Sequence, residues 1–291
     1  MTRIIAALAE ISAGYDTLFC DLWGCLHDGH APYPAAVAAL AAFRAGGGRV
    51  VLLTNAPRPN RYIIQQLDRI GVPRSAWDLV VSSGDAAQIA MYAGAVGRRV
   101  HHIGPQKDDG FFTDRPEGMA DAPAVERVAL DEAEGIVCTG PFDEMTETPG
   151  DYRATFLYAK ARGLVLLCAN PDLVVDLGDR RIWCAGGLAA LYDEMGGTSL
   201  YYGKPHPPVY DLARRRLEAA GGGAARILAI GDGIATDIQG GIGEGIDTLF
   251  VTGGLAAEAF GDDVEAPDPV RLRTWLDERQ LSPDCAIGRL R

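Results

Sequence analysis

The fold of this chain is decided by the segment Thr17-Leu-Phe-Cys-Asp-Leu-Trp-Gly-Cys-Leu-His-Asp-Gly29. Its first four residues predict a short buried strand, which delivers the carboxylate of Asp21 before the chain turns at Gly24. Parallel sheets carry their reactive groups at the carboxyl ends of strands, so Asp21 is a candidate catalytic residue. An Asp-x-x-Gly sequence is also common in ordinary turns. The rest of the chain therefore has to supply the partners that a catalytic aspartate needs.

On either side of this segment, short apolar runs alternate with longer stretches of helical periodicity. This pattern is typical of βαβ units and predicts an α/β fold with a largely parallel sheet. Strands are expected over Thr17–Asp21, Arg49–Thr54, Leu79–Ser82, Arg99–Ile103, Gly135–Cys138, Leu164–Cys168, Ile227–Ile230 and Thr248–Val251. Helices are expected over Pro34–Ala45, Asn60–Ile70, Asp85–Ala95, Asp151–Arg162, Gly187–Met195, Pro207–Ala220, Asp237–Gly243 and Val270–Gln280.

The length and the charge limit the possible functions. A chain of 291 residues exceeds what one small core supports, so two lobes are expected. The formal charge of -12 argues against general binding to nucleic acid or to anionic membranes, because both need clustered Lys and Arg. An anionic small substrate is still compatible with this charge, since a metal ion, a few cations and backbone N–H groups bind phosphate even in an acidic protein.

The six cysteines form no Cys-x-x-Cys pair and lie mostly within apolar runs, as reduced and buried thiols do. This usage favours a cytoplasmic protein. Residues 3–11 are too short, and too soon interrupted by Glu10, to span a membrane. They are expected to form an amphipathic first helix.

Two further segments place hydrogen-bond donors and a cation after apolar runs. The second strand, Val50-Val-Leu-Leu-Thr-Asn55, ends in a hydroxyl and an amide, and a helix cap is the alternative role for these two residues. The turn Gly203-Lys-Pro-His-Pro207 holds Lys204 on a stiff, proline-bounded segment before a helix. Thr54, Asn55 and Lys204 are therefore candidate ligands of a phosphate group.

The segment Ile227-Leu-Ala-Ile-Gly-Asp-Gly-Ile-Ala-Thr-Asp237 supplies two more carboxylates. Asp232 directly follows a predicted strand, and Asp237 lies at the start of the next helix, where an N-cap is its alternative role. Two carboxylates suit a hard cation such as Mg²⁺, which prefers oxygen ligands. Taken in order, the four segments offer a nucleophile, hydrogen-bond donors for a phosphate group, a cation and a metal site.

This order of motifs resembles the haloacid dehalogenase superfamily, and the resemblance covers nearly the whole chain. It implies a Rossmann-like, doubly wound parallel-sheet core. The insert from Ser83 to Leu200 is long enough for an independent α/β domain, and it resembles the C2 cap of the class IIA members, the NagD-type and 4-nitrophenylphosphatase-like enzymes. We therefore expect residues 1–82 and 201–291 to form the core domain and residues 83–200 to form the cap. The landmarks of the cap are Gly140-Pro-Phe-Asp143 followed by Tyr152, Ala169-Asn-Pro-Asp172 and Ala185-Gly-Gly-Leu188.

The resemblance also implies roles for individual residues. Asp21 attacks phosphorus and forms an aspartyl-phosphate. Mg²⁺ is held by Asp21, Asp232 and the backbone carbonyl of Trp23, and Asp237 supports it through water. Phosphate is bound by Lys204, by Thr54, and by backbone N–H groups around Asn55 and Gly24. The candidate substrate residues on the cap are Asp143, Glu144, Asn170 and Asp172, although Asn-Pro-Asp is also ordinary turn chemistry.

Trp23 departs from the family pattern, because phosphatases of this type usually carry a second Asp two residues after the nucleophile. That Asp serves as general acid and then as general base, a contribution worth ~10²–10⁴-fold. An indole does neither, so three hypotheses follow. In the first, the substrate has a leaving group that needs little protonation, as in an anhydride, acyl phosphate or aryl phosphate. A nearby residue, His27 or Asp28, replaces the acid, although both fall in a flap where a structural role is the default. Or hydrolysis is vestigial, and the protein binds a phosphorylated metabolite.

A haloacid dehalogenase is a further alternative, because such enzymes carry an aromatic residue at this position. They need no metal, so the retained Asp232 and Asp237 favour phosphate chemistry. The expected partner is a small phosphorylated metabolite, with no nucleic acid and no membrane. A homodimer occurs among relatives, but no apolar stripe in this sequence predicts one.

Overall fold

The chain forms two compact units in the computed structural model, which describes residues 2–177, 180–223 and 226–291. The first unit contains the residues up to Thr54, Ile64–Val81 and Tyr210–Arg291, and the second contains Asn55–Ile63 and Ser82–Val209. The second unit thus includes residues 55–63 and 201–209 besides the expected cap segment. The domain limits at 82/83 and 200/201 stay a prediction.

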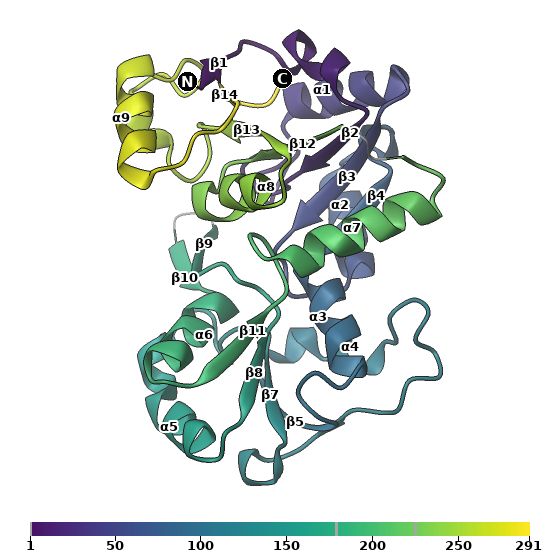
Figure 1. The fold of residues 1–291 in the computed structure, drawn as a ribbon, viewed down its shortest axis with the longest axis vertical. Helices are drawn as coiled ribbons and strands as arrows, with labels where there is room; N and C mark the ends of the chain where they lie inside the picture. Colours follow the sequence, from purple (N-terminus) through teal and green to yellow (C-terminus); the bar gives the residue numbers. More distant parts are fainter. Residues whose placement is uncertain (1, 178–179, 224–225) are drawn as a thin grey trace. The chain divides into compact units, whose positions relative to one another are not determined.

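A seven-stranded sheet forms the centre of the first unit, in the order β1-β14-β13-β12-β2-β3-β4 (Figure 1). Each strand pairing from β1 across to β3 is parallel. The strands are β1 (Arg3–Ile4), β2 (Thr17–Cys20), β3 (Arg49–Thr54), β4 (Leu79–Ser82), β12 (Ile227–Gly231), β13 (Asp247–Val251) and β14 (Cys285–Ile287). Such a sheet needs apolar residues on both faces, and all four residues of β2 are buried.

The strand order reverses at β2. The chain passes from β2 outward to β3 and β4, and it later returns to place β12, β13 and β14 on the other side of β2. Cys20, the last residue of β2, is opposite Ile230 of β12 and Leu52 of β3. The three strands therefore end at the same edge, and this edge is the topological switch point at which open α/β sheets bind ligands.

The helices of the first unit begin and end at recognisable signals. Pro34 is the first residue of α1 (Pro34–Ala45), and Pro269 is the first residue of α9 (Pro269–Arg279). Proline suits this position, because the first N–H group of a helix has no partner within the helix. The carboxylate of Asp268 caps α9 by accepting hydrogen bonds from two backbone N–H groups. The remaining helices that contribute to this unit are α2 (Asn60–Ile70), α7 (Pro207–Ala219) and α8 (Gln239–Gly243), with short turns η1 (Leu8–Glu10), η2 (Ser12–Gly14), η3 (Arg74–Ala76), η7 (Ile234–Ile238) and η8 (Ala257–Phe260).

The second unit contains a five-stranded parallel sheet in the order β11-β8-β7-β5-β6, together with an antiparallel pair of strands, β9 and β10. Its core includes the rings of Tyr152 and Phe156, which stack on each other, and the ring of Tyr192, which is tilted against Phe156. Its strands are β5 (Arg99–Ile103), β6 (Glu126–Arg127), β7 (Gly135–Cys138), β8 (Val165–Cys168), β9 (Val174–Leu177), β10 (Arg180–Trp183) and β11 (Thr198–Tyr201). Its helices and turns are α3 (Ser83–Tyr92), η4 (Gln106–Asp108), α4 (Gly110–Thr113), η5 (Leu130–Glu132), η6 (Pro149–Tyr152), α5 (Arg153–Ala161) and α6 (Ala185–Glu194).

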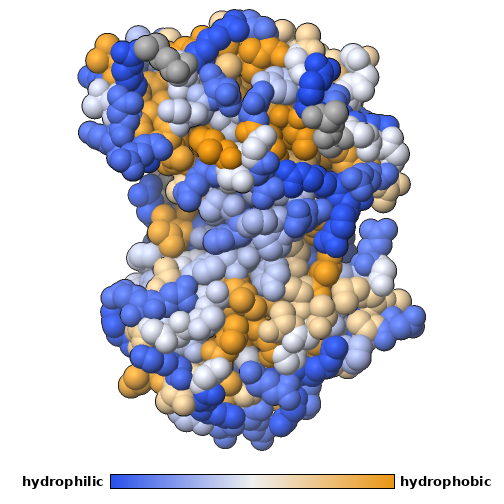
Figure 2. All heavy atoms as spheres, viewed as in Figure 1, coloured by the Kyte–Doolittle hydropathy of each residue, from blue (hydrophilic) through white to orange (hydrophobic). Residues whose placement is uncertain are grey.

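The expected α/β class with a Rossmann-like parallel-sheet core is confirmed. The prediction of a helix over residues 3–11 is wrong. This segment starts as β1, because Arg3 and Ile5 donate backbone hydrogen bonds to the carbonyls of Asp284 and Ala286 at the edge of the sheet, and two short 3₁₀ turns follow. Polar and apolar residues are interspersed on the face shown in Figure 2, which is typical of a surface in contact with water. Within the described ranges, no helix combines the length and apolar character needed to cross a membrane.

In the second unit, the chain that leaves β3 crosses closely over the start of α3. Gly84 donates its backbone N–H to Ala56, and Ser82 donates its hydroxyl to the carbonyl of Arg58. A Cβ at Gly84 would lie 2.4 Å from the carbonyl carbon of Pro57 and 2.5 Å from that of Arg58. Backbone atoms have little freedom to give way, so only glycine fits at this crossing.

We expect Gly84→Ala to lower the free energy of unfolding of the second unit by about 1–3 kcal/mol, the usual cost of overpacking. Gly14→Ala is the matched control, since a Cβ there meets nothing within 4 Å. Urea denaturation of the two variants measures the difference. Equal stability of Gly84→Ala and the unmodified protein would show that the crossing relaxes without cost.

Candidate active site

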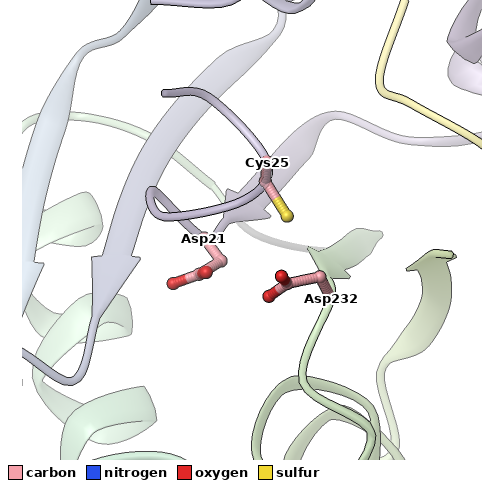
Figure 3. Close-up of side chains that lie close together, drawn as sticks. All are labelled: Asp21, Cys25 and Asp232. Atoms are coloured by element: carbon pink, nitrogen blue, oxygen red, sulfur yellow. The ribbon is translucent and has the colours of Figure 1, made fainter. Parts of the chain in front are cut away.

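The pairing of β2 with β12 brings Asp21 and Asp232 together at one edge of the sheet. Asp21 donates its backbone N–H to Ile230 over 2.8 Å, which continues the strand pairing by one residue. The two side chains are buried, with 9% and 5% of their residue surfaces exposed. Single carboxylate oxygens of Asp21 and Asp232 lie, together with the sulfur of Cys25, within 4.8 Å of one another (Figure 3). Two residues that are far apart in the sequence thus form one anionic cluster.

Glycines form a close-fitting cradle around Asp232. A Cβ on Gly24 would lie 2.2 Å from Oδ2 of Asp232, and a Cβ on Gly254 would lie 1.9 Å from the same atom. Gly24 also has a φ of 76°, a conformation that favours glycine. Oδ2 of Asp232 accepts the backbone N–H of Leu255 over 2.9 Å. The backbone therefore holds this carboxylate in one place, as a metal site requires.

Asp237 is tied to the same strand end. Its Oδ2 atom accepts the backbone N–H of Gly233 over 3.1 Å, and only 5% of its surface is exposed. A Cβ on Gly231, the last residue of β12, would lie 2.0 Å from the carboxyl carbon of Asp237. Gly233 takes the N-cap position of η7, so Asp237 lies inside the turn and is not the helix cap.

The donor set of this cluster fits Mg²⁺. Asp21 and Asp232 offer hard carboxylate oxygens from adjacent strand ends, and a glycine cradle fixes one of the two. Mg²⁺ typically takes one or two protein carboxylates and fills the other positions with water or substrate oxygens.

Trp23, the residue that departs from the family pattern, packs inside its own flap. A Cβ on Gly29 would lie 2.3 Å from the indole, and the indole meets the imidazole of His27 edge to face at 5.6 Å. His27 uses Nδ1 to accept the backbone N–H of Gly29, and burial lowers its pKa to about 4. Asp28 accepts hydrogen bonds from the backbone N–H groups of His30 and Ala31. Both bonds lower the pKa of Asp28, and the bond from Ala31 has the larger effect. Both groups therefore carry structural hydrogen bonds of the flap, and near neutral pH neither holds a proton that it readily donates.

The phosphate-binding candidates Asn55 and Lys204 meet in the second unit. The backbone N–H of Lys204 donates to Oδ1 of Asn55 over 2.7 Å, and Nδ2 of Asn55 donates back to the Lys204 carbonyl over 2.9 Å. The same amide donates to Oδ1 of Asp172 over 2.8 Å. Asn55 thus links the segment after β3, the Lys204 turn and the Asn-Pro-Asp turn. Thr54, the last residue of β3, belongs to the first unit and is partly buried.

The four cap candidates differ in how they are used. Asn170 accepts the backbone N–H of Asp172, so the Asn-Pro-Asp segment is in part a turn held by its own side chains. Asp143 is exposed and accepts hydrogen bonds from Met145 and Thr146 within its own loop. Glu144 forms an ion pair with Lys107. The structure therefore gives each of these residues a structural contact, and their roles toward substrate stay predictions.

Two residues of interest were missed as functional candidates. Cys25 lies in no motif of its own, and Asp232, which it adjoins, is more than two hundred positions away in the sequence. Asp108 lies just beyond β5 in a segment whose sequence shows little periodicity. It is 2% exposed, and among the described residues neither of its oxygens finds a partner in hydrogen-bond geometry. Burial raises its pKa to about 6, although nearby Thr139, Lys107 and Arg58 oppose the shift.

This fold and this site define a class, that of Rossmann-like hydrolases with a carboxylate cluster at the switch point of the sheet. A family profile described as haloacid dehalogenase-like hydrolase matches residues 18–114, and a second profile, described as HAD-hydrolase-like, matches residues 201–273. A haloacid dehalogenase-like hydrolase from Brucella suis is 38% identical with a TM-score of 0.83, and the match covers 98% of this chain and 99% of that one. The chain belongs to the haloacid dehalogenase-like hydrolases, in class IIA, and is an enzyme of the hydrolase type.

Other relatives carry more specific names. The D-glycerol 3-phosphate phosphatase of Mycobacterium tuberculosis is 26% identical over 295 residues, which cover 96% of this chain and 74% of the relative. A solved structure of a glycerol phosphate phosphatase from that organism, in complex with magnesium, is 25% identical with a TM-score of 0.63 and coverage of 90% and 74%. A 4-nitrophenylphosphatase from Thermotoga maritima shares the fold, with 19% identity, a TM-score of 0.70 and 96% coverage of both chains.

The buried carboxyl of Asp108 predicts a pH-dependent stability. Its pKa is raised in the folded state, so the folded protein binds the proton more tightly and loses stability as the pH rises from about 4 to about 6. The shift corresponds to a loss on the order of 3 kcal/mol. We therefore expect the free energy of unfolding of Asp108→Asn, relative to that of the unmodified protein, to be higher at pH 7.5 than at pH 4.5.

Urea denaturation at the two pH values measures this change. Asp131→Asn, at an exposed position of the same unit, is the control and should show no such trend. A stability difference for Asp108→Asn that is the same at both pH values would mean that Asp108 is ionised throughout.

Proposed function

We propose that this chain is a Mg²⁺-dependent phosphohydrolase that acts on a small phosphorylated metabolite through an aspartyl-phosphate on Asp21, with weakened general-acid catalysis. The observation that carries this proposal is the cluster of Asp21 and Asp232 at the switch point of the parallel sheet. A buried carboxylate nucleophile beside a second, rigidly held carboxylate is the arrangement that metal-assisted phosphoryl transfer needs.

The reaction has two steps. A carboxylate oxygen of Asp21 forms a bond to phosphorus as the bond to the leaving oxygen breaks, and water then attacks phosphorus and restores the carboxylate. When bound, Mg²⁺ neutralises charge on the phosphoryl oxygens and on the two carboxylates. Asp21, Asp232 and the carbonyl of Trp23 would hold the metal, and Asp237 would support it.

The phosphoryl oxygens are bound by the remaining motif residues. Lys204 supplies a positive charge, Thr54 a hydroxyl, and the backbone around Asn55 and Gly24 supplies N–H groups. The hydrogen bonds between Asn55 and Lys204 support this assignment, because they hold the two motifs in a fixed relation.

The substrate class is supported by the names of relatives. Besides the D-glycerol 3-phosphate phosphatase, a dihydroxyacetone phosphatase of Corynebacterium glutamicum is 31% identical over 98 residues. Both names describe small phosphorylated substrates. We propose that Asp143, Glu144, Asn170 and Asp172 contact the substrate from the second unit. The six cysteines, all buried and free, support a reducing cytoplasm as the location.

The weakened acid catalysis follows from the flap. Trp23 has no proton to give, and His27 and Asp28 carry the structural hydrogen bonds of the flap. A leaving group that departs as a stable anion needs no proton, so an acyl, anhydride or aryl phosphate is favoured over an alkyl phosphate.

The first test is the nucleophile. We expect Asp21→Asn to lower Mg²⁺-dependent release of phosphate from 4-nitrophenyl phosphate by more than about 10³-fold, because an amide does not attack phosphorus. Phosphate release over time measures the loss, and Asp262→Asn, an exposed carboxylate of the same unit, is the control. Full activity of Asp21→Asn would exclude the aspartyl-phosphate mechanism.

The second test concerns the leaving group. We expect the unmodified protein to turn over 4-nitrophenyl phosphate far faster than an alkyl phosphate. Trp23→Asp should raise kcat/KM for the alkyl phosphate by about tenfold or more, part of the ~10²–10⁴-fold that general-acid catalysis is worth. Trp23→Asn is the matched control, since it removes the indole without adding an acid.

Other outcomes of these assays point to the alternatives. Equal turnover of aryl and alkyl phosphates by the unmodified protein would mean that some other group supplies the proton. No turnover of any phosphate, with thermal stabilisation by a phosphorylated metabolite, would indicate a binding protein. Release of halide in the presence of a chelator would indicate a dehalogenase.

A further inference from the structure

The sulfur of Cys25 is part of the carboxylate cluster. The thiol is 1% exposed and comes from the same loop as Asp21, directly after the glycine that cradles Asp232. Figure 3 shows the sulfur on the side of its residue that faces the two carboxylates. The three potential ligand atoms, two oxygens and one sulfur, all lie within 4.8 Å of one another, and all three residues belong to the first unit.

The two carboxylate oxygens of this cluster fit Mg²⁺, whereas the sulfur does not. Mg²⁺ takes oxygen ligands, so a thiol adds nothing to its binding. Zn²⁺ and other thiophilic divalent ions bind thiolate and carboxylate together, at about 2.3 Å and about 2.0–2.2 Å. In tetrahedral coordination, two such ligands of one Zn²⁺ ion are about 3.6 Å apart. The three atoms lie within 4.8 Å of one another, so side-chain rotations that move them by about an ångström complete the site.

We propose that Asp21, Cys25 and Asp232 form a binding site for a thiophilic divalent cation, Zn²⁺ above all, and that this cation excludes Mg²⁺. The thiol loses its proton to solvent as the sulfur–metal bond forms, and the charge of the ion drives this loss. Three protein ligands leave one coordination position open.

Occupation of this site inhibits the enzyme, an effect that rests on the proposed function. The cation uses an oxygen of Asp21, the nucleophile, and withdraws electron density from that carboxylate. It also binds Asp232, which the Mg²⁺ form needs. The cluster thus makes the enzyme sensitive to the ratio of free Zn²⁺ to free Mg²⁺, because one set of side chains serves two incompatible ions.

The alternative is that the thiol only packs against the carboxylates or donates a weak S–H hydrogen bond. The two readings differ in what happens when a thiophilic cation is added.

The test is a titration of the full-length, metal-free protein with Cd²⁺, whose bond to a thiolate gives an ultraviolet charge-transfer absorption. We expect a band that saturates at one equivalent in the unmodified protein and is lost in Cys25→Ser and Cys25→Ala. Cys285→Ser, a buried thiol of the same unit, is the control and should keep the band. Asp232→Asn, which keeps the thiol, should weaken Cd²⁺ binding by about tenfold or more.

Competition titrations extend the test to Zn²⁺. The ratio of Zn²⁺ affinity to Mg²⁺ affinity should fall by at least about tenfold in Cys25→Ser and in Cys25→Ala. Absence of the band in the unmodified protein, its persistence without Cys25, or an unchanged affinity ratio would each overturn the proposal. The absorption requires no turnover, so it decides the cation site even if no phosphate is hydrolysed, and a failure of the phosphohydrolase proposal is recognised separately.

Discussion

The parallel pairing of β2 with β12 is the interaction on which the site depends. The backbone hydrogen bond from Asp21 to Ile230 sets the register, and this register places Asp21 and Asp232 at one edge of the sheet. A shift of one residue would turn either carboxylate to the opposite face, because side chains alternate along a strand. The residues of β2 and most of β12 are buried, so the packing of the sheet also positions these two carboxylates.

Close backbone approach is the second constraint. Gly24 and Gly254 leave no room for a Cβ beside Asp232, and Gly231 leaves none beside Asp237. The carboxylates are thereby held by atoms that do not move easily, as a metal site requires. The same compactness brings Cys25 into the cluster, and a side chain that packs the loop then becomes a potential ligand.

In the flap after Asp21, Trp23 occupies the position at which family phosphatases usually carry an aspartate. Trp23 packs over Gly29 and against His27, and His27 and Asp28 hold the backbone of the same loop. These contacts hold the loop without an aspartate at position 23. In the second unit, Asn55 links the Lys204 turn to the Asn-Pro-Asp turn, so residues with expected ligand roles also hold the structure together.

The sequence by itself determined the α/β class and the family, because apolar periodicity and the order of the strand-end motifs are local properties of the chain. It also marked Trp23 as the residue that departs from the family pattern. Only the tertiary structure decided that residues 3–5 add a strand to the sheet edge, that Asp108 is buried with a raised pKa, and that Cys25 adjoins Asp21 and Asp232. Edge pairing, desolvation and ligand clustering all depend on neighbours that are distant along the chain, and a local pattern does not specify such neighbours.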